Sequence, residues 1–465
     1  MTGCAVGPRY SRPVALAAPA DRGQPPAAYK ESQGWKQAQP AATSLHEDWW
    51  RVFGIAELDD LEAQVDVSNQ TVKAAEARFR QARTLVAQSR SALYPTLGAG
   101  PSITTNRFSG RTATHPTQIG EYSNLAAPFD FTYELDAWGR IRHTIAAARE
   151  EVQAASADLD TIRLSLHAEM AIDYFELRSL DAQRQLLDRT LVAYQKALDL
   201  TQSQFAGGLA SGAEVAQART QLETTRAQYV EIGVARAQFE HAIATLAGRT
   251  PESLALALQP LAGPPPVIPT GMPSQLLERR PDVAAAERRV AEANERIGIA
   301  QAAFFPSLFI TATGGVQGDS IVNWITWPSR FWALGPAALQ TIYDAGRRRA
   351  AEQGAIAAYD LTVANYREAA IEAFQQVEDQ LSTLRTLEQE VDAQRAAVAA
   401  AERSLDLAMQ RYTGGLVTYL EVVSAQTIAL TNERIAVDLL RRRMDATVLL
   451  IKALGGGWDI SKLPA

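Results

Sequence analysis

A run of residues without proline or glycine, from 140 to 206, constrains this chain more than any other feature. Apolar side chains recur in it at alternating spacings of four and three residues, at Ile141, Ile145, Ala148, Val152, Ala155, Leu159, Ile162 and Leu166. This spacing is typical of a coiled-coil seam, in which each apolar residue meets a partner helix. As one helix the run would be about 100 Å long. No compact globule can enclose such a helix, so the run predicts a long bundle or tube.

The second half of the chain repeats the order of the first. Residues 74–78 with Tyr94-Pro95 recur about 211 residues later as 285–288 with Phe305-Pro306. Further along, 205–209 recurs as 412–416, so that both long helical runs stop at a Gly-Gly pair. A second long helix is therefore predicted over about 346–412, matching one over about 139–205. The order predicts a tandem duplication.

The domain boundaries follow from this repeat and from composition. Repeat 1 spans 46–248 and repeat 2 spans 274–456, separated by a Pro-rich connector, 249–273, that cannot form a regular helix. Residues 1–45 are rich in Pro, Ala, Gln and Ser and predict an extended strap, and 457–465 form a tail.

Each repeat also predicts a pair of strands before its long helix. Apolar and mostly polar residues alternate from Leu125 to Asp136, as in a strand with one face in an apolar and one in a polar environment. The expected strands span about 96–108, 122–136, 307–317 and 330–343. The fold class is thus mainly α with a small β part, in tandem repeats of helix, strand pair, long helix and helix. If the strands enter a membrane, other copies must complete the sheet, because four strands cannot close a barrel.

Composition excludes several classes of protein. No stretch approaches the ~20 apolar residues of a spanning helix, which excludes a helical membrane protein. The net charge of −7, without a basic face, argues against nucleic acid. Five scattered histidines and a single cysteine predict no metal site and no cofactor. No nucleophile has a positioned base, so no catalytic residue is expected.

The amino terminus contains the one cysteine, Cys4, directly after Gly3. A Gly-Cys pair near an amino terminus is typical of a lipoprotein, in which the cysteine is acylated, although the apolar stretch that should precede it is missing. The alternative is a free cysteine in a tail. Cys4 is the candidate lipidation residue.

Several short motifs, spread along the chain from the amino terminus to the second repeat, resemble one known family. They are Gly3-Cys4-Ala5-Val6-Gly7-Pro8, Trp49-Trp50-Arg51-Val52-Phe53-Gly54, Arg279-Arg280-Pro281-Asp282-Val283, Asp344-Ala345-Gly346-Arg347 and Arg411-Tyr412. The chain resembles the TolC-like outer-membrane efflux channels over essentially its whole length, in particular the lipoprotein branch that serves resistance-nodulation-division (RND) pumps.

The resemblance implies an assembly and its partners. It implies a homotrimer in the cell outer membrane, whose twelve-stranded β-barrel continues into an α-helical tunnel through the periplasm. It further implies docking of the tunnel tip onto a periplasmic adaptor and an inner-membrane RND transporter. The exported substrate is not predicted.

The resemblance also places a periplasmic gate near the two Gly-Gly turns. It implies an apolar gate residue at Leu420, an arginine that ties the closed helices at Arg411, and a lumen-facing acid at Glu214. Ser424 departs from the pattern, because many relatives have aspartate there, and Glu421 could replace the lost charge. Rings of Glu214 and Glu421 would favour cations. Alternatively, both are favourable acids in the first turn of a helix.

Two groups of residues are candidates for the membrane interface. Arg347, Arg348 and Arg349 open the second long helix, where the helix dipole disfavours cations. Contact with lipid head groups at the inner face of the outer membrane would explain them, and solvated arginines near a strand end are the alternative. Trp324, Trp327 and Trp332 lie among the aromatic residues at the strand ends.

A second function is compatible with the heptads alone. It is a periplasmic coiled-coil scaffold or adaptor protein without a pore. The amphipathic strands favour the channel, because a scaffold has no use for a lipid-facing sheet.

Overall fold

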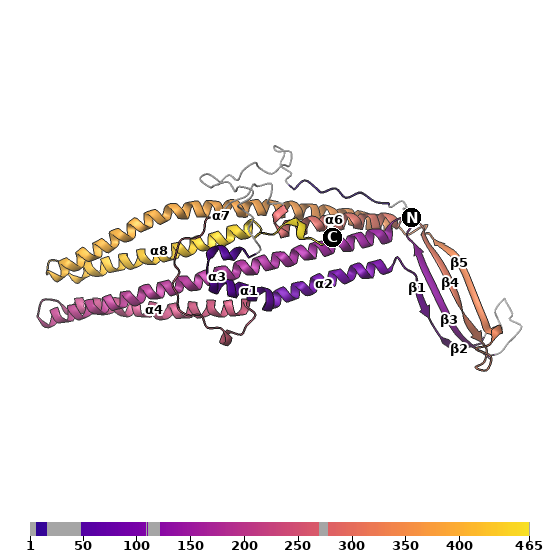
Figure 1. The fold of residues 1–465 in the computed structure, drawn as a ribbon, viewed down its shortest axis with the longest axis horizontal. Coiled ribbons are helices and arrows are strands. Elements are labelled where there is room, and N and C mark those ends of the chain that lie inside the picture. The colour runs from indigo at the N-terminus through magenta and orange to yellow at the C-terminus, as the bar shows by residue number, and fades with distance from the viewer. Residues whose placement is uncertain (1–5, 16–47, 108, 110–120, 269–277, 465) are drawn as a thin grey trace.

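The computed structural model describes residues 6–15, 48–107, 109, 121–268 and 278–464. A long helical body continues at one end into a β-sheet (Figure 1). The mainly helical fold with a small β part is as predicted. The strap predicted over 1–45 is described only at 6–15.

The helices repeat in length from one half of the chain to the other. The first half contains α1 (Ala56–Ser68), α2 (Gln70–Ser91), α3 (Arg140–Ala206) and α4 (Gly212–Leu246). The second contains α6 (Pro281–Ala302), α7 (Arg347–Thr413) and α8 (Tyr419–Ala453). Both α3 and α7 have 67 residues, or about 100 Å of helix. Both α4 and α8 have 35 residues, so the duplication is visible in the elements themselves.

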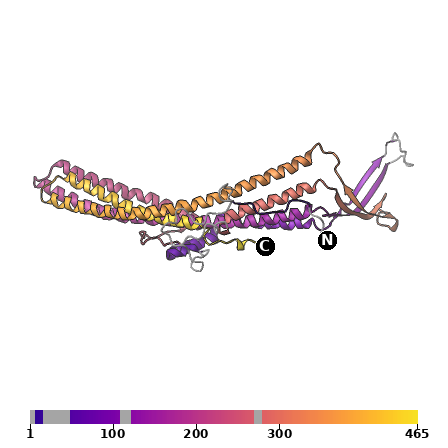
Figure 2. The ribbon, with the colours of Figure 1, turned by 90° about the horizontal axis from the view of Figure 1, so that it is seen from above.

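The helices form two hairpins that lie side by side. α3 packs on α4, α7 packs on α8, and α3 also contacts α8. Nearer the sheet, α6 lies between α3 and α7, and α7 diverges from α3 (Figure 2). Where α7 diverges, its side chains are more exposed: Ile356 is 41% exposed in the single chain, and the buried positions of α7 begin at Tyr366.

Charged side chains are buried where α1 meets α3. His167 of α3 lies 2.7 Å from Glu62 and 3.4 Å from Asp66, both on α1, and its ring stacks on Trp50. Burial alone would lower the pKa of His167, but hydrogen bonds to Asp66 and Glu62, with their charges, raise it to about 9. Burial raises the pKa of Glu62 to about 7. The imidazolium thus links the first helix to the long one.

The amino-terminal segment and the connector are held to the rest of the chain by hydrogen bonds of their backbone groups. The Val6 N–H donates to the carbonyl of Trp138, and Asn294 of α6 donates to the carbonyl of Pro8. The connector is bound to α3 at Gln259, whose N–H donates to Asp181, and to α4 at Leu256, whose carbonyl accepts from Arg236.

The sheet has four strand positions in antiparallel order. β1 (Thr96–Ala99) and β2 (Ser102–Arg107) both pair with β3 (Glu121–Leu135). β3 pairs with β4 (Ser307–Gly318), and β4 pairs with β5 (Arg330–Leu339). Among the described residues, β1, β2 and β5 pair on one side only, so the sheet has two open edges.

Two predicted strands need correction. The strand expected over 96–108 is broken into β1 and β2 at Gly100-Pro101, because proline has no N–H to donate to a neighbouring strand. The strand expected over 330–343 ends at Leu339, because its partner β4 begins at Ser307, which lies opposite Leu339. Residues 340–343 have no strand beside them there.

The register aligns one apolar face across the sheet. Phe131 of β3 lies between Leu97 of β1 and Ala312 of β4. Ala312 in turn pairs with Leu334 of β5. Directly paired residues share a face. Most polar side chains of the same strands lie on the other face: Thr104, Asn106, Asn124, Asp130, Thr132, Glu134, Thr311, Thr313 and Gln317. Polar residues share the apolar face toward the end of the sheet away from the helices: Thr105, Arg107, Glu121, Ser123 and Arg330.

None of the described helices combines the length and the apolarity that crossing a membrane requires.

Candidate functional site

The end of the helical body farthest from the sheet consists of two neighbouring turns (Figure 1). One joins α3 to α4 at 207–211, and the other joins α7 to α8 at 414–418. Each uses a glycine with positive φ, Gly208 at 75° and Gly415 at 71°, a conformation that costs other residues free energy. We call these two turns, with the helix ends beside them, the tip.

A small core connects the two hairpins at the tip. The rings of Tyr412 and Tyr419 pack edge to face, with centroids 5.2 Å apart. The Tyr412 hydroxyl donates to Thr201 of α3 over 3.2 Å, and the Tyr194 hydroxyl donates to the carbonyl of Gln426 on α8 over 3.3 Å. Tyr412 and Tyr194 therefore each join a helix of one repeat to a helix of the other.

Glu214 contacts both turns. One carboxylate oxygen accepts from the N–H of Ser211 over 2.7 Å, in a capping box at the start of α4. The other accepts from the N–H of Tyr419 over 3.1 Å, at the start of α8. The hydrogen bonds from these two N–H groups lower the pKa of Glu214. Glu214 thus stabilises the first turns of α4 and α8. A role for it in the lumen of an assembly stays a prediction.

The other predicted gate residues lie on the second hairpin. Arg411 donates to Glu421 over 2.7 Å, across the α7–α8 turn, with the two side chains 54% and 46% exposed. Leu420 is 60% exposed and Ser424 is also exposed. The structure therefore brings Arg411 and Glu421 together, while Leu420 and Ser424 face outward from the single chain.

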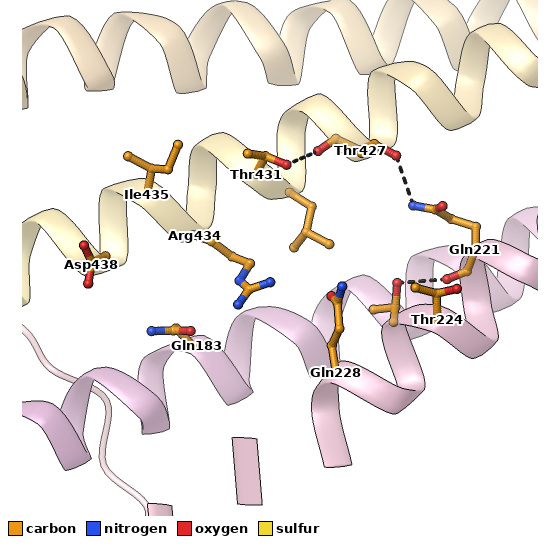
Figure 3. Close-up of a pocket in the computed structure, with 11 residues that line it drawn as sticks. Gln183, Gln221, Thr224, Gln228, Thr427, Thr431, Arg434, Ile435 and Asp438 are labelled. Atoms are coloured by element: carbon orange, nitrogen blue, oxygen red, sulfur yellow. Dashed lines mark hydrogen bonds between the residues drawn. The ribbon is translucent and has the colours of Figure 1, made fainter. Parts of the chain in front are cut away.

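A polar cavity of about 530 Å³ lies between α4 and α8, on the sheet side of the tip. In Figure 3, Gln221, Thr224 and Gln228 of α4 face Thr427 and Thr431 of α8. The amide of Gln221 donates to the Thr427 hydroxyl over 3.3 Å. This cavity was not predicted from the sequence, because nothing in the sequence indicated that α4 and α8 face each other.

The three arginines at the start of α7 are not equivalent. Arg348 is half-buried and donates to Asp344 over 2.7 Å, while Arg347 and Arg349 are exposed. Arg348 is therefore engaged within the chain, and contact of the three arginines with lipid head groups stays a prediction. Asp344 also accepts from the N–H groups of Gly346 and Arg348, so a carboxylate offsets the cations at this helix end.

The same cap begins α3. Asp136 accepts from the N–H groups of Ile141 and Arg142, each over 3.0 Å, and from the Arg142 side chain. Gly139 and Gly346, with φ of 86° and 87°, occupy the same position before the two helices. No role was predicted for the aspartate of either cap. The recurrence of an aspartate before both helices was the available signal.

The predicted tryptophans lie toward the opposite end of the sheet from these arginines. Trp327 and Trp332 are exposed, and the guanidinium of Arg330 lies 3.7 Å from the Trp327 ring centroid. Trp324 is half-buried in the β4–β5 loop, where its backbone packs close to Gly318. Its side chain is therefore less available to a membrane than the other two.

Two further predictions concern the lipidation residue and the absence of a metal site. Cys4 lies outside the described residues. Within the described part of the chain, no group of three or more His, Cys, Asp or Glu side chains could bind a metal ion.

Comparisons with known proteins agree over the whole chain. A family model described as outer membrane efflux protein matches residues 63–249 and 272–456. The toluene efflux pump outer membrane protein TtgF of Pseudomonas putida is 33% identical, covering 100% of this chain and 96% of that protein. The pyoverdine export outer membrane protein OpmQ of Pseudomonas aeruginosa is 30% identical, covering 88% of this chain and 87% of OpmQ.

Solved structures share the fold. The outer-membrane channel OprN superposes with a TM-score of 0.89 at 26% identity, covering 98% of this chain and 100% of OprN. Both family-model matches fall on the two repeats, and the relatives match nearly from end to end. The chain therefore belongs to the outer membrane efflux protein family.

Proposed function

We propose that this protein is the outer-membrane exit duct of a tripartite efflux system. The observation that carries the proposal is the register of the sheet, which places apolar side chains in one row across all four strand positions: Leu97, Phe131, Ala312 and Leu334. An apolar outer face with a polar inner face is the pattern of a barrel that spans a lipid bilayer around water. A scaffold without a pore has no use for such a face.

The open edges support assembly from several copies. An unpaired edge inside a bilayer leaves backbone groups without hydrogen-bond partners, so β5 of one copy must pair with β1 and β2 of the next. Three copies of four strand positions give the twelve-stranded barrel of the family that the chain resembles. The long hairpins of the three copies then form a tunnel into the periplasm.

The partners follow from the proposed role. The tip would meet a periplasmic adaptor and an inner-membrane RND transporter, which supplies the energy. TtgF and OpmQ are named for toluene and pyoverdine, two chemically unlike molecules. This supports a duct whose cargo is chosen by its pump, with no chemical step in this chain.

The tip is the proposed gate of the duct. Glu214, Arg411 and Glu421 are engaged in contacts that join or close the turns, and Leu420 is free to meet other copies on the axis of the assembly. Opening would separate the hairpins at the tip. Ser424 is uncharged and would add no charge to the gate.

Membrane attachment at the inner face is proposed on two grounds. Val6 binds the carbonyl of Trp138 at the junction of helices and sheet, so an acyl chain on Cys4, two residues earlier in sequence, would start near the inner leaflet. Arg347 and Arg349 are exposed at the same junction, where anionic head groups would attract them.

The test is the mass of the detergent-extracted protein, together with its conductance in planar bilayers. We expect three chains per particle and small, cation-selective single-channel currents. A water-soluble species that gives no current would overturn the proposal.

A further inference from the structure

The loop that joins β4 to β5, residues 319–329, is an ordered turn. A 3₁₀ turn spans Trp327–Ser329. The carbonyl of Asn323 accepts hydrogen bonds from the hydroxyls of Thr326 and Ser329, and these two hydroxyls lie 2.8 Å apart. These hydrogen bonds define the conformation of the loop, and the conformation determines which side chains face outward.

These outward side chains are strongly apolar. Ile321, Val322, Ile325 and Trp327 are between 76% and 88% exposed. Clustered exposure of large apolar groups on an ordered turn is costly in water and is typical of a surface that binds something apolar.

The loop is continuous with the apolar face of the sheet. Arg330, the first residue of β5, pairs with Val316 and therefore lies on the same face as Trp332 and Leu334. Its guanidinium covers the Trp327 ring. A tryptophan next to an arginine is suited to the boundary between acyl chains and anionic head groups.

We propose that this loop inserts its apolar side chains into the outer leaflet of the membrane, beyond the end of the barrel. Arg330 then meets the phosphate groups of the lipids around it. The inference rests on the proposed function, because that function places the helices in the periplasm and this end of the sheet at the outer leaflet.

The experiment uses the single cysteine of the chain. In full-length protein with Cys4→Ser, one cysteine is introduced by Val322→Cys, Leu334→Cys or Ala333→Cys and labelled with an environment-sensitive fluorophore. Leu334 and Ala333 are adjacent in β5 and lie on opposite faces of the sheet, so they are matched controls for insertion of the barrel. Each labelled protein is reconstituted in vesicles with and without nitroxide-labelled phospholipid.

We expect nitroxide lipid to remove most of the fluorescence at positions 322 and 334 and little of it at 333. Quenching at 334 with none at 322 would overturn the inference while the membrane-spanning sheet stands. A label at 322 shielded from aqueous iodide yet not quenched by lipid would also overturn it, assigning the loop to contact with another copy. Equal quenching at 333 and 334 would overturn the proposed barrel itself.

Discussion

Single side chains stabilise the turns of the tip. Glu214 accepts hydrogen bonds from backbone groups of both hairpins, whereas Arg411 and Glu421 pair across one turn. An exposed ion pair of this kind contributes roughly 0.2–1 kcal/mol. In an assembly the same pair recurs in every copy, so its effect on the gate is multiplied.

Leu420→Ser and Glu421→Ala are each expected to raise the leak conductance of the duct. The first removes an exposed apolar contact of the proposed gate, and the second leaves Arg411 without its partner across the turn. Single-channel recordings in planar bilayers measure the effect. Glu223→Ala is the control, because it breaks an exposed pair with Arg226 within α4 and away from the turns. Unchanged current in both tip variants would contradict this placement of the gate.

His167→Gln is expected to destabilise the protein in a pH-dependent way. The pKa of His167 is raised to about 9, so the stabilisation from its charge is full below the ordinary value of 6.5 and is lost as pH rises through 9. The difference in Tm between wild type and variant should therefore be large at pH 6 and shrink by pH 10.

Thermal unfolding followed by circular dichroism in detergent checks this dependence. His241→Gln, at an exposed position of α4, is the control and should leave Tm unchanged at both pH values. A Tm difference for His167→Gln that is the same at pH 6 and pH 10 would show that the imidazolium charge is not what links α1 to α3.

Both long helices begin with the same arrangement of residues. An aspartate accepts from the first helical N–H groups, and a glycine with positive φ turns the chain into the helix. The arrangement recurs because the two halves are duplicates. It also permits basic residues directly after the cap, where the dipole alone would disfavour them.

Asp136→Ala is expected to lower the free energy of unfolding by about 1 kcal/mol, the usual contribution of a helix cap. The first turn of α3 should then exchange its amide hydrogens faster, as measured by mass spectrometry. Asp392→Ala is the control, because this exposed residue in α7 pairs only with Arg395 among the contacts described for it. Equal exchange in the first turn of α3 for wild type and Asp136→Ala would contradict the capping role.

The sequence predicts the bounds of the long helices well and the bounds of the paired strands less well. The helices expected over 139–205 and 346–412 occur at 140–206 and 347–413, because a heptad pattern and a Gly-Gly stop are local signals. The strand expected to reach 343 stops at Leu339, since its length depends on where β4 begins. Trp324 is half-buried because of loop geometry that composition does not encode. The pair of Arg348 with Asp344 was accessible from the sequence, because the two residues are four apart and an aspartate recurs before both long helices.

At the tip, too, contacts within one helix were predictable from the sequence, and contacts between distant segments were not. An acid in the first turn of α4 was predictable from the helix dipole. Its second hydrogen bond, to Tyr419, joins residues 205 apart and depends on how the two hairpins align. The polar cavity between α4 and α8 depends on the same alignment.

In the proposed trimer, the polar face of the sheet would be the wall of a water-filled duct. Asp130 of β3 lies on this face, opposite Thr313 of β4. In the proposed assembly its copies would form a ring at one depth. Glu134 lies on the same face but pairs with Arg140, so its charge is offset.

Asp130→Asn is expected to reduce the preference of the duct for cations, because carboxylate rings attract cations into a pore. The reversal potential across a bilayer with a salt gradient measures this preference. Glu134→Gln is the matched control and should change the potential less. A reversal potential that does not respond to Asp130→Asn would place this face away from the path of the ions.

The open edges of the sheet also have a genetic consequence. In the proposed assembly, the edge strand of each copy pairs with the edge strand of its neighbour. A copy with a damaged edge, one whose edge strand cannot pair, therefore prevents the barrel from closing in every particle that contains it. When damaged and intact copies are made in equal amounts, most particles contain at least one damaged copy. Alleles with substitutions at β5 or β1 should therefore act dominantly over the wild-type allele, whereas alleles that prevent the chain from being made should be recessive.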